Sequence, residues 1–131
     1  MLAKVKGWED HQHYKDRTPP CVVYVNWAEY QGRRVSKVGF SNNPDKRLKE
    51  FNNGLRHLLR KGYLGQPVAF ARFFSAPLAG ASSARAVERA FFEASGLPII
   101  SEMGREVVDC EPGVVSEILC RAVGWGERND D

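Results

Sequence analysis

Tyr24 and Lys37 could together take a proton from a reacting group. They lie in two segments rich in β-branched and aromatic residues, CVVYVNW (21–27) and VSKVGF (35–40), which predict a β-hairpin. Directly opposed residues of a hairpin share a face of the sheet. If the numbers of each opposed pair sum to an odd value, as with a turn at Gln31-Gly32, the side chains of Tyr24 and Lys37 lie on the same face. A cation beside a phenol favours the phenolate, so the pair could act as a general base. The alternative is a half-buried tyrosine beside a solvated lysine.

The second strand leads into a short helix with an excess of positive charge. In SNNPDKRLKEFNNG (41–54), Asn43 suits the N-cap, Pro44 suits the first helical position, and Gly54 suits the residue after the last turn. The basic side chains of this helix are Lys46, Arg47 and Lys49. They either bind nucleic-acid phosphate or form an ordinary solvated surface, and the residues alone leave both readings open.

The remaining segments predict an α+β fold. A further helical turn is expected in residues 55–65, a third strand in residues 67–75 and a second helix in residues 82–96. Residues 105–110 are expected to form a short edge strand, and residues 111–124 a closing helix. The order ββαβα plus a C-terminal helix predicts a small mixed or antiparallel sheet of about three strands flanked by helices.

The length and composition fit one domain. The chain has 131 residues, of which 43% are hydrophobic. We expect a polar N-terminal arm in residues 1–20, the domain in residues 21–125 and a polar tail in residues 126–131. No stretch has the roughly 20 apolar residues of a membrane span, and the N-terminus is too polar for a secretory signal, which favours a cytoplasmic protein without membrane contact. The HQH sequence at 11–13 could bind a metal, but it lacks helical spacing.

The cysteines predict no redox or metal chemistry. Cys21, Cys110 and Cys120 are odd in number, widely spaced and set among apolar residues. This pattern predicts reduced thiols in the core rather than a disulfide framework or a zinc site.

Charge is distributed unevenly along the chain. The formal net charge is +3, but residues 1–87 contain 15 Lys or Arg against 6 Asp or Glu, whereas residues 88–131 contain 4 against 10. A basic half can present a positive face to a polyanion despite a small total charge. The expected phosphate-binding residues are Lys46, Lys49, Arg56, Arg60, Lys61 and Arg72. The acidic half could instead contact a protein partner.

Four short motifs occur in an order and spacing that is more specific than any one of them. They are VYV at 23–25, KVGFSNNPDKRLKEFN at 37–52, AVERAFF at 86–92 and GREVV at 104–108. Together they resemble the GIY-YIG nuclease family, in particular its branch of small domains with a KIG- or KVG-type second motif. The resemblance covers roughly residues 21–110 and implies a metal-dependent endonuclease that hydrolyses nucleic-acid phosphodiester bonds, with DNA favoured over RNA and with Mg²⁺ or Mn²⁺ as the cofactor.

The resemblance also implies a role for each of four residues. Tyr24 matches the tyrosine that activates the attacking water, and Lys37 takes the place of the first tyrosine of the second motif. Arg47 matches the helix arginine that holds the scissile phosphate, and Glu88 matches the carboxylate that binds the metal. We therefore expect these four side chains to converge on one concave face.

Two positions depart from the family pattern. Many relatives carry a His or Tyr one helical turn after the arginine, where this chain has Phe51, and many have an asparagine beyond the metal-binding glutamate, where this chain has only Asn129. His57 could supply the missing proton carrier if the segment after Gly54 returned to the site. The first alternative is therefore a catalytically inactive nucleic-acid-binding module, and the second is a protein-interaction or inhibitor module. Without a separate recognition domain, specificity would come from a homo-oligomer or a partner protein.

Overall fold

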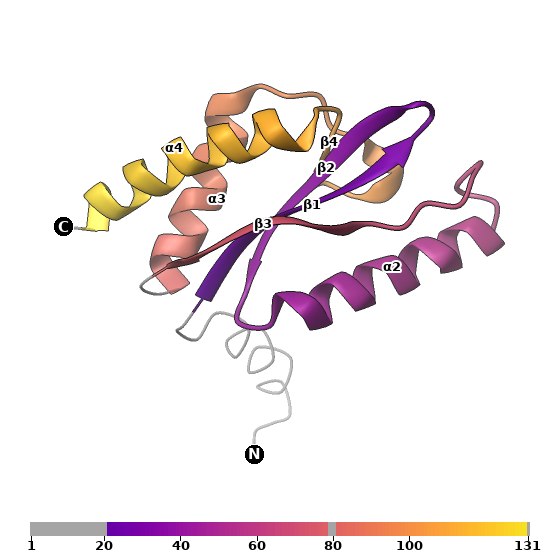
Figure 1. The fold of residues 1–131 in the computed structure, drawn as a ribbon, viewed down its shortest axis with the longest axis horizontal. Helices are drawn as coiled ribbons and strands as arrows, with labels where there is room; N and C mark the ends of the chain where they lie inside the picture. The colour runs from indigo at the N-terminus through magenta and orange to yellow at the C-terminus, as the bar shows by residue number, and fades with distance from the viewer. Residues whose placement is uncertain (1–20, 79–80, 131) are drawn as a thin grey trace, which may run out of the picture.

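The computed structural model describes residues 21–78 and 81–130, which form an α+β fold (Figure 1). The strands are β1 (Cys21–Tyr30), β2 (Arg33–Ser41), β3 (Ala71–Leu78) and β4 (Val107–Val108). The helices are α2 (Pro44–Arg60), α3 (Ala81–Ser95) and α4 (Pro112–Asp130), with a single 3₁₀ turn, η1 (Ser101–Met103). The predicted fold class is confirmed, with four strands instead of about three. In the part of the chain described here, no helix is long and apolar enough to cross a bilayer.

The sheet is antiparallel throughout, in the order β3-β1-β2-β4. Its central hairpin turns at Gln31-Gly32, with φ values of 54° and 79°, as a two-residue hairpin turn requires. Because the turn is tight, pairing extends beyond the two predicted strand segments as far as Tyr30 and Arg33. The register sets Tyr24 opposite Gly39, and the predicted placement of Tyr24 and Lys37 on one face is confirmed.

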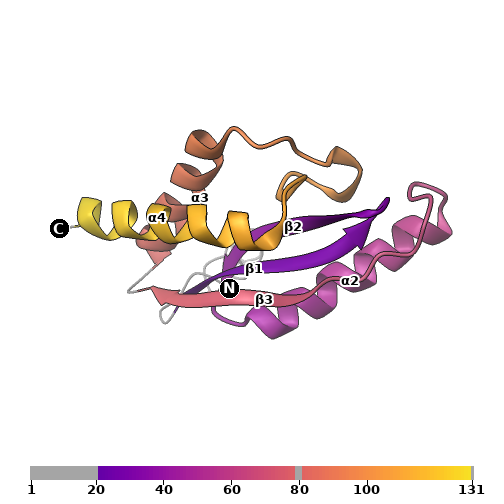
Figure 2. The ribbon, with the colours of Figure 1, turned by 45° about the horizontal axis from the view of Figure 1, so that its top comes forward.

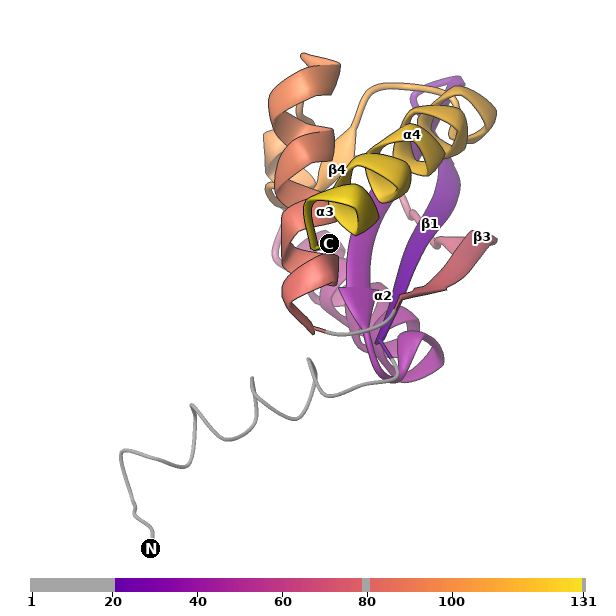
Figure 3. The same ribbon diagram turned by 90° about the vertical axis from the view of Figure 1, so that its left-hand side faces the viewer.

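Alternating strand residues divide the core into two clusters on opposite faces of the sheet. Figure 2 shows α3 and α4 on one side of the sheet and α2 on the other. Cys21, Val23 and Val25 of β1 face α3 and α4, where they pack with Phe91 and Leu119. This first cluster accounts for the close packing of α3 on α4 against one side of the sheet, which Figure 3 shows from the end. The helix α2 covers the other side.

The second core cluster explains why α2 is longer than predicted. Leu55 is buried in this cluster, and Leu58 and Leu59 pack against it. These residues continue the apolar stripe of the helix beyond Gly54, so the prediction that the helix ends at Gly54 is wrong. The N-terminus agrees with prediction: the Asn43 side chain accepts a hydrogen bond from the amide of Lys46, and Pro44 is the first helical residue.

The third strand begins four residues later than predicted, at Ala71 instead of residue 67. The side chain of Asn52 donates to the carbonyl of Phe70 at 3.0 Å and accepts from its amide at 2.8 Å. Because these backbone groups bond to α2, they are not available to the sheet, and Val68 and Phe70 enter the second core as loop residues.

The C-terminal helix also exceeds its predicted length. It runs to Asp130, so the predicted boundary between domain and tail at residue 125 lies within the helix. All three cysteines are free, as predicted. Cys21 is buried, as predicted, and Cys110 is partly buried. Burial raises the pKa of the Cys110 thiol. Cys120 is exposed, so the prediction that it lies in the core is wrong. The predicted arm, with its HQH sequence at 11–13, lies outside the described residues.

Candidate active site

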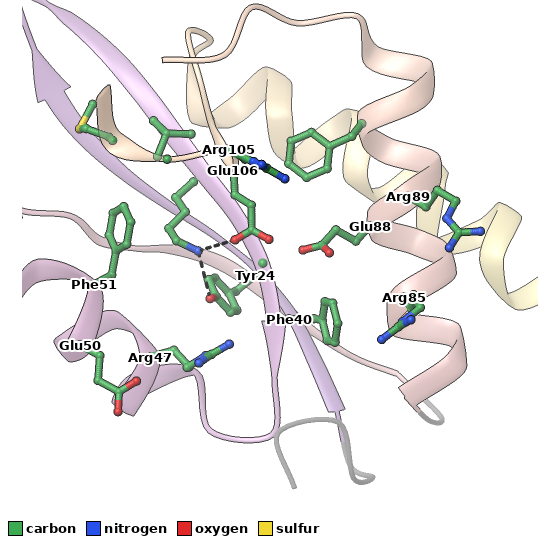
Figure 4. A pocket seen from close by; sticks show the side chains of 16 residues that line it. Tyr24, Phe40, Arg47, Glu50, Phe51, Arg85, Glu88, Arg89, Arg105 and Glu106 are labelled. Carbon is green, nitrogen blue, oxygen red and sulfur yellow. Dashed lines mark hydrogen bonds and ion pairs between the residues drawn. The ribbon is translucent and has the colours of Figure 1, made fainter. Parts of the chain in front are cut away.

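A cavity of about 840 Å³ opens beside β2, between α2 and α3 (Figure 4). The short strand β4 pairs with Ser36 and Lys37 only. Among the described residues, the rest of β2 from Gly39 to Ser41 therefore has β1 as its single strand neighbour. Tyr24 and Lys37, on the α2 face of the sheet, line the cavity at this open edge.

The structure brings the four residues with predicted catalytic roles around this cavity. Tyr24 and Lys37 come from β1 and β2, Arg47 comes from the first turn of α2, and Glu88 comes from the middle of α3. Figure 4 shows Arg47 and Glu88 pointing into the cavity from opposite walls. The predicted convergence on one concave face is confirmed, and the chemical role of each residue stays a prediction.

Tyr24 lies at the bottom of the cavity, where its ring crosses the backbone of β2. It is only 3% exposed, and its hydroxyl is 3.5 Å from the Lys37 Nζ. The ring fits because the facing residue is Gly39: a Cβ there would lie 2.5 Å from the Tyr24 hydroxyl. A glycine is therefore required opposite this tyrosine.

Gly39→Ala should lower the free energy of unfolding by about 1–3 kcal/mol, because the methyl group would displace the Tyr24 ring. Denaturant titration measures this loss. The matched control is Gly54→Ala, where a Cβ meets nothing within 4 Å and a helical alanine should stabilise α2 by up to about 1 kcal/mol. Equal effects of the two substitutions would show that the tyrosine ring does not lie against residue 39.

Lys37 is a buried cation with three kinds of neighbour. It is 9% exposed, and its Nζ lies 3.1 Å from a carboxylate oxygen of Glu106 and 3.5 Å from the Tyr24 hydroxyl. The ring centroid of Phe51 lies 5.0 Å from the same nitrogen, within the range of a cation–π contact. A buried ammonium needs such partners to offset its lost hydration. The geometry lets Lys37 donate to Tyr24 while Glu106 holds its charge in place.

Glu106 is a site residue that the sequence-based prediction missed. It belongs to the GREVV segment, and its backbone carbonyl accepts a hydrogen bond from the amide of Val38. The register of β4 pairs Val107 with Lys37, which brings the neighbouring carboxylate to the lysine. The sequence alone does not show which residue of β2 lies opposite Val107, so it could not predict that Glu106 contacts Lys37.

A hydrogen bond fixes the turn that leads to Glu106. The hydroxyl of Tyr30 donates to the Glu102 carboxylate at 2.7 Å. This bond lowers the pKa of Glu102, and together with burial it raises the pKa of Tyr30. The tip of the β1–β2 hairpin is thus tied to η1, and Met103 at the end of η1 is buried in the second core.

Arg72, which was predicted to bind nucleic acid, does not line the cavity. Its guanidinium forms an ion pair with Asp45 at 3.0 Å, and its Nε donates to the side chain of Asn26 at 3.0 Å. The same guanidinium lies 5.8 Å from the centroid of the Tyr24 ring. These contacts give Arg72 a part in positioning Tyr24, and its role in binding nucleic acid stays a prediction.

The other predicted nucleic-acid-binding residues are exposed on α2 or at its end, and none of them lines the cavity. They are Lys46, Lys49, Arg56, Arg60 and Lys61. Lys46 is 4.0 Å from the carboxylate of Glu50, and the side chains of Arg56 and Arg60 contact Asn53 and His57. His57 is exposed beside Arg60 and does not line the cavity, so the hypothesis that it replaces the missing proton carrier is wrong.

The donors in the cavity fit a hydrated divalent cation. Glu88 and Glu106 both project into it (Figure 4). Within the described ranges, no group of three or more His, Cys, Asp or Glu side chains is close enough to hold a metal. Mg²⁺ and Mn²⁺ prefer oxygen ligands, and Mg²⁺ keeps several waters, so one or two carboxylates in a cavity of this size suit it.

The chain was compared with protein-family models, with curated proteins and with solved structures, and none of the three comparisons gave a match. Its function is therefore inferred from the side chains of the cavity.

Proposed function

We propose that this protein is a metal-dependent endonuclease of the GIY-YIG type, which hydrolyses phosphodiester bonds in nucleic acid and favours DNA. The observation that carries the proposal is the grouping of a tyrosine–lysine pair, an arginine and a glutamate around one cavity. Hydrolysis of a phosphodiester needs a base for the water, positive charge at the phosphate oxygens and help for the leaving oxygen. The cavity offers a residue for each of these needs.

Tyr24 is the proposed general base. The ammonium of Lys37 donates to its hydroxyl oxygen at 3.5 Å and would stabilise the phenolate that accepts the proton of water. Arg47 enters from α2, and its planar guanidinium can hold two phosphate oxygens at once.

Glu88 is the proposed ligand of Mg²⁺ or Mn²⁺. A bound cation of this kind neutralises phosphate charge and assists the leaving oxygen. Glu88 lies on the wall of α3 across the cavity from Arg47, so the phosphate would be held between them. Glu106 also lines the cavity, but its carboxylate forms an ion pair with Lys37 at 3.1 Å.

A second candidate is a nucleic-acid-binding module without nuclease activity. It is favoured by Phe51, which lines the cavity and packs against the Lys37 ammonium. Many relatives of the proposed family carry a proton-transferring side chain at this position, whereas a phenyl ring cannot transfer a proton.

The deciding experiment is incubation of the purified protein with supercoiled plasmid and with single-stranded DNA and RNA, in Mg²⁺, Mn²⁺ or EDTA. We expect nicking that requires the metal and that EDTA abolishes. Tight binding without nicking would favour the inactive module. Absence of both binding and nicking would favour the protein-interaction module.

Replacing Arg56, Arg60 and Lys61 together by Glu should weaken nucleic-acid binding about tenfold and flatten its salt dependence. These side chains are exposed on the basic surface of α2, so the fold should survive. Filter binding at several salt concentrations measures both effects. The neutral R56Q/R60Q/K61Q variant should fall between wild type and the reversed variant. An unchanged salt slope would mean that α2 does not contact phosphates.

A further inference from the structure

Three arginines line the cavity on the side opposite Arg47. Arg85 and Arg89 lie one turn apart on α3, and Arg105 lies in the loop between η1 and β4. All three are exposed; in Figure 4, Arg85 and Arg89 extend from the same helix as Glu88, and Arg105 lies next to Glu106. They come from two segments that are distant in sequence, so their grouping is produced by the fold.

These three arginines differ from other arginines of the molecule in their partners. Arg33 and Arg34 pair with Asp109 and Glu111, and Arg72 pairs with Asp45. For Arg85, Arg89 and Arg105, no ion pair or hydrogen bond is found within residues 21–78 and 81–130. Like charges one turn apart on a helix repel each other, so the grouping of these arginines does not stabilise the fold.

The cavity has fewer carboxylates than cationic side chains, and Glu88 is the one carboxylate on α3 beside Arg85 and Arg89. Five cationic and three anionic side chains line the cavity. Two of the anionic ones are engaged elsewhere, since Glu50 lies 4.0 Å from Lys46 and Glu106 lies 3.1 Å from Lys37. The α3 side of the cavity therefore carries an excess of positive charge, which favours an anionic ligand.

We propose that Arg85, Arg89 and Arg105 form a second phosphate-binding subsite, which holds the nucleic-acid backbone beside the scissile phosphate. The position of this subsite beside a scissile phosphate rests on the proposed function. The binding of an anionic strand by the three arginines does not depend on it. Arg47 comes from α2, Arg85 and Arg89 come from α3, and Arg105 comes from the loop before β4, so a chain with repeated phosphates can contact several of them while crossing the cavity. A nucleic-acid strand is such a chain.

The test is DNA binding in EDTA, where hydrolysis cannot contribute. Fluorescence anisotropy with labelled single-stranded and duplex oligonucleotides, over a range of salt concentrations, compares wild type with R85Q/R89Q/R105Q. We expect the variant to bind at least about tenfold more weakly, with a log–log salt slope reduced by about 2–3. R85K/R89K/R105K keeps the charges and should recover most of the slope.

The matched control is R33Q/R34Q/R121Q, which removes the same charge from exposed arginines that do not line the cavity. Its salt slope should stay close to that of wild type. An equal loss in control and test variants would overturn the subsite, because net charge alone would explain it. Wild-type affinity in R85Q/R89Q/R105Q would overturn it too.

Plasmid cleavage by the wild type separates this inference from the proposed function. If the wild type cuts and R85Q/R89Q/R105Q binds normally, the subsite is refuted and the nuclease proposal stands. If the wild type does not cut but R85Q/R89Q/R105Q loses affinity relative to its control, the subsite stands and the nuclease proposal fails. A wild type that binds no nucleic acid refutes both.

Discussion

Glu88→Gln should reduce metal-dependent cleavage by at least about 10³-fold, while nucleic-acid binding in EDTA is retained. The amide keeps the volume and the helical position of the side chain but removes the charge that would hold the cation. Glu88 is half-buried on α3 and lines the cavity, so the change acts at the site itself. Cleavage rates in Mg²⁺ and Mn²⁺, together with anisotropy in EDTA, measure the two parts of this prediction.

The matched control for this substitution is Glu93→Gln on the same helix. Glu93 is exposed and does not line the cavity, so its loss should leave cleavage within about twofold of wild type. If Glu88→Gln also cuts at the wild-type rate, then Glu88 is not the metal ligand. Glu106 would then be the next carboxylate to change, since it lines the same cavity.

Tyr24→Phe should slow cleavage by about 10²-fold or more, because it removes only the hydroxyl that would accept the proton of the attacking water. The ring stays in place, and with it the close packing against Gly39. The hydroxyl is 3.5 Å from the Lys37 Nζ, so its loss also removes one partner of that ammonium while Glu106 and Phe51 remain. Single-turnover cleavage rates across a pH series measure the chemical step.

Tyr63→Phe serves as the control for this variant, because Tyr63 is 68% exposed and does not line the cavity. It should cleave at the wild-type rate. A Tyr24→Phe protein that cuts as fast as this control would exclude Tyr24 as the base. Lys37 would then be the candidate for that role.

The buried Lys37 links the proposed base to the segment before β4. Its ammonium is within 3.5 Å of a tyrosine hydroxyl and 3.1 Å of a carboxylate. A cation held on both sides in this way is fixed in position before substrate arrives. This part of the site thus joins the β1–β2 hairpin to the loop before β4, which is distant from the hairpin in sequence.

The sequence by itself determined the features that depend on residues close together in the chain, such as the hairpin register and the start of α2. The turn at Gln31-Gly32 sets which residues of β1 and β2 oppose each other. Because side chains alternate between the two faces of a strand, this register puts Tyr24 and Lys37 on the same face. Asn43 and Pro44 fixed the start of α2, since a cap acts through bonds within one helical turn.

Contacts between distant residues decided what the sequence left open. The end of α2 passed Gly54 because Leu55 is buried in the second core cluster, and the cost of a glycine within a helix is smaller than the gain from that burial. The start of β3 moved because Asn52 binds the backbone of Phe70.

The same distinction applies to the site. Its four predicted residues could be named from motifs in order along the chain. The Glu106–Lys37 pair and the approach of Arg105 to Arg85 and Arg89 could not, because the sequence around each of these residues gives no sign of the partner. Charges at a sheet edge or on a helix are usually solvated surface. Here the tertiary structure places them around a common cavity, where the low exposure of Lys37 and the shared charge of the three exposed arginines indicate a chemical role.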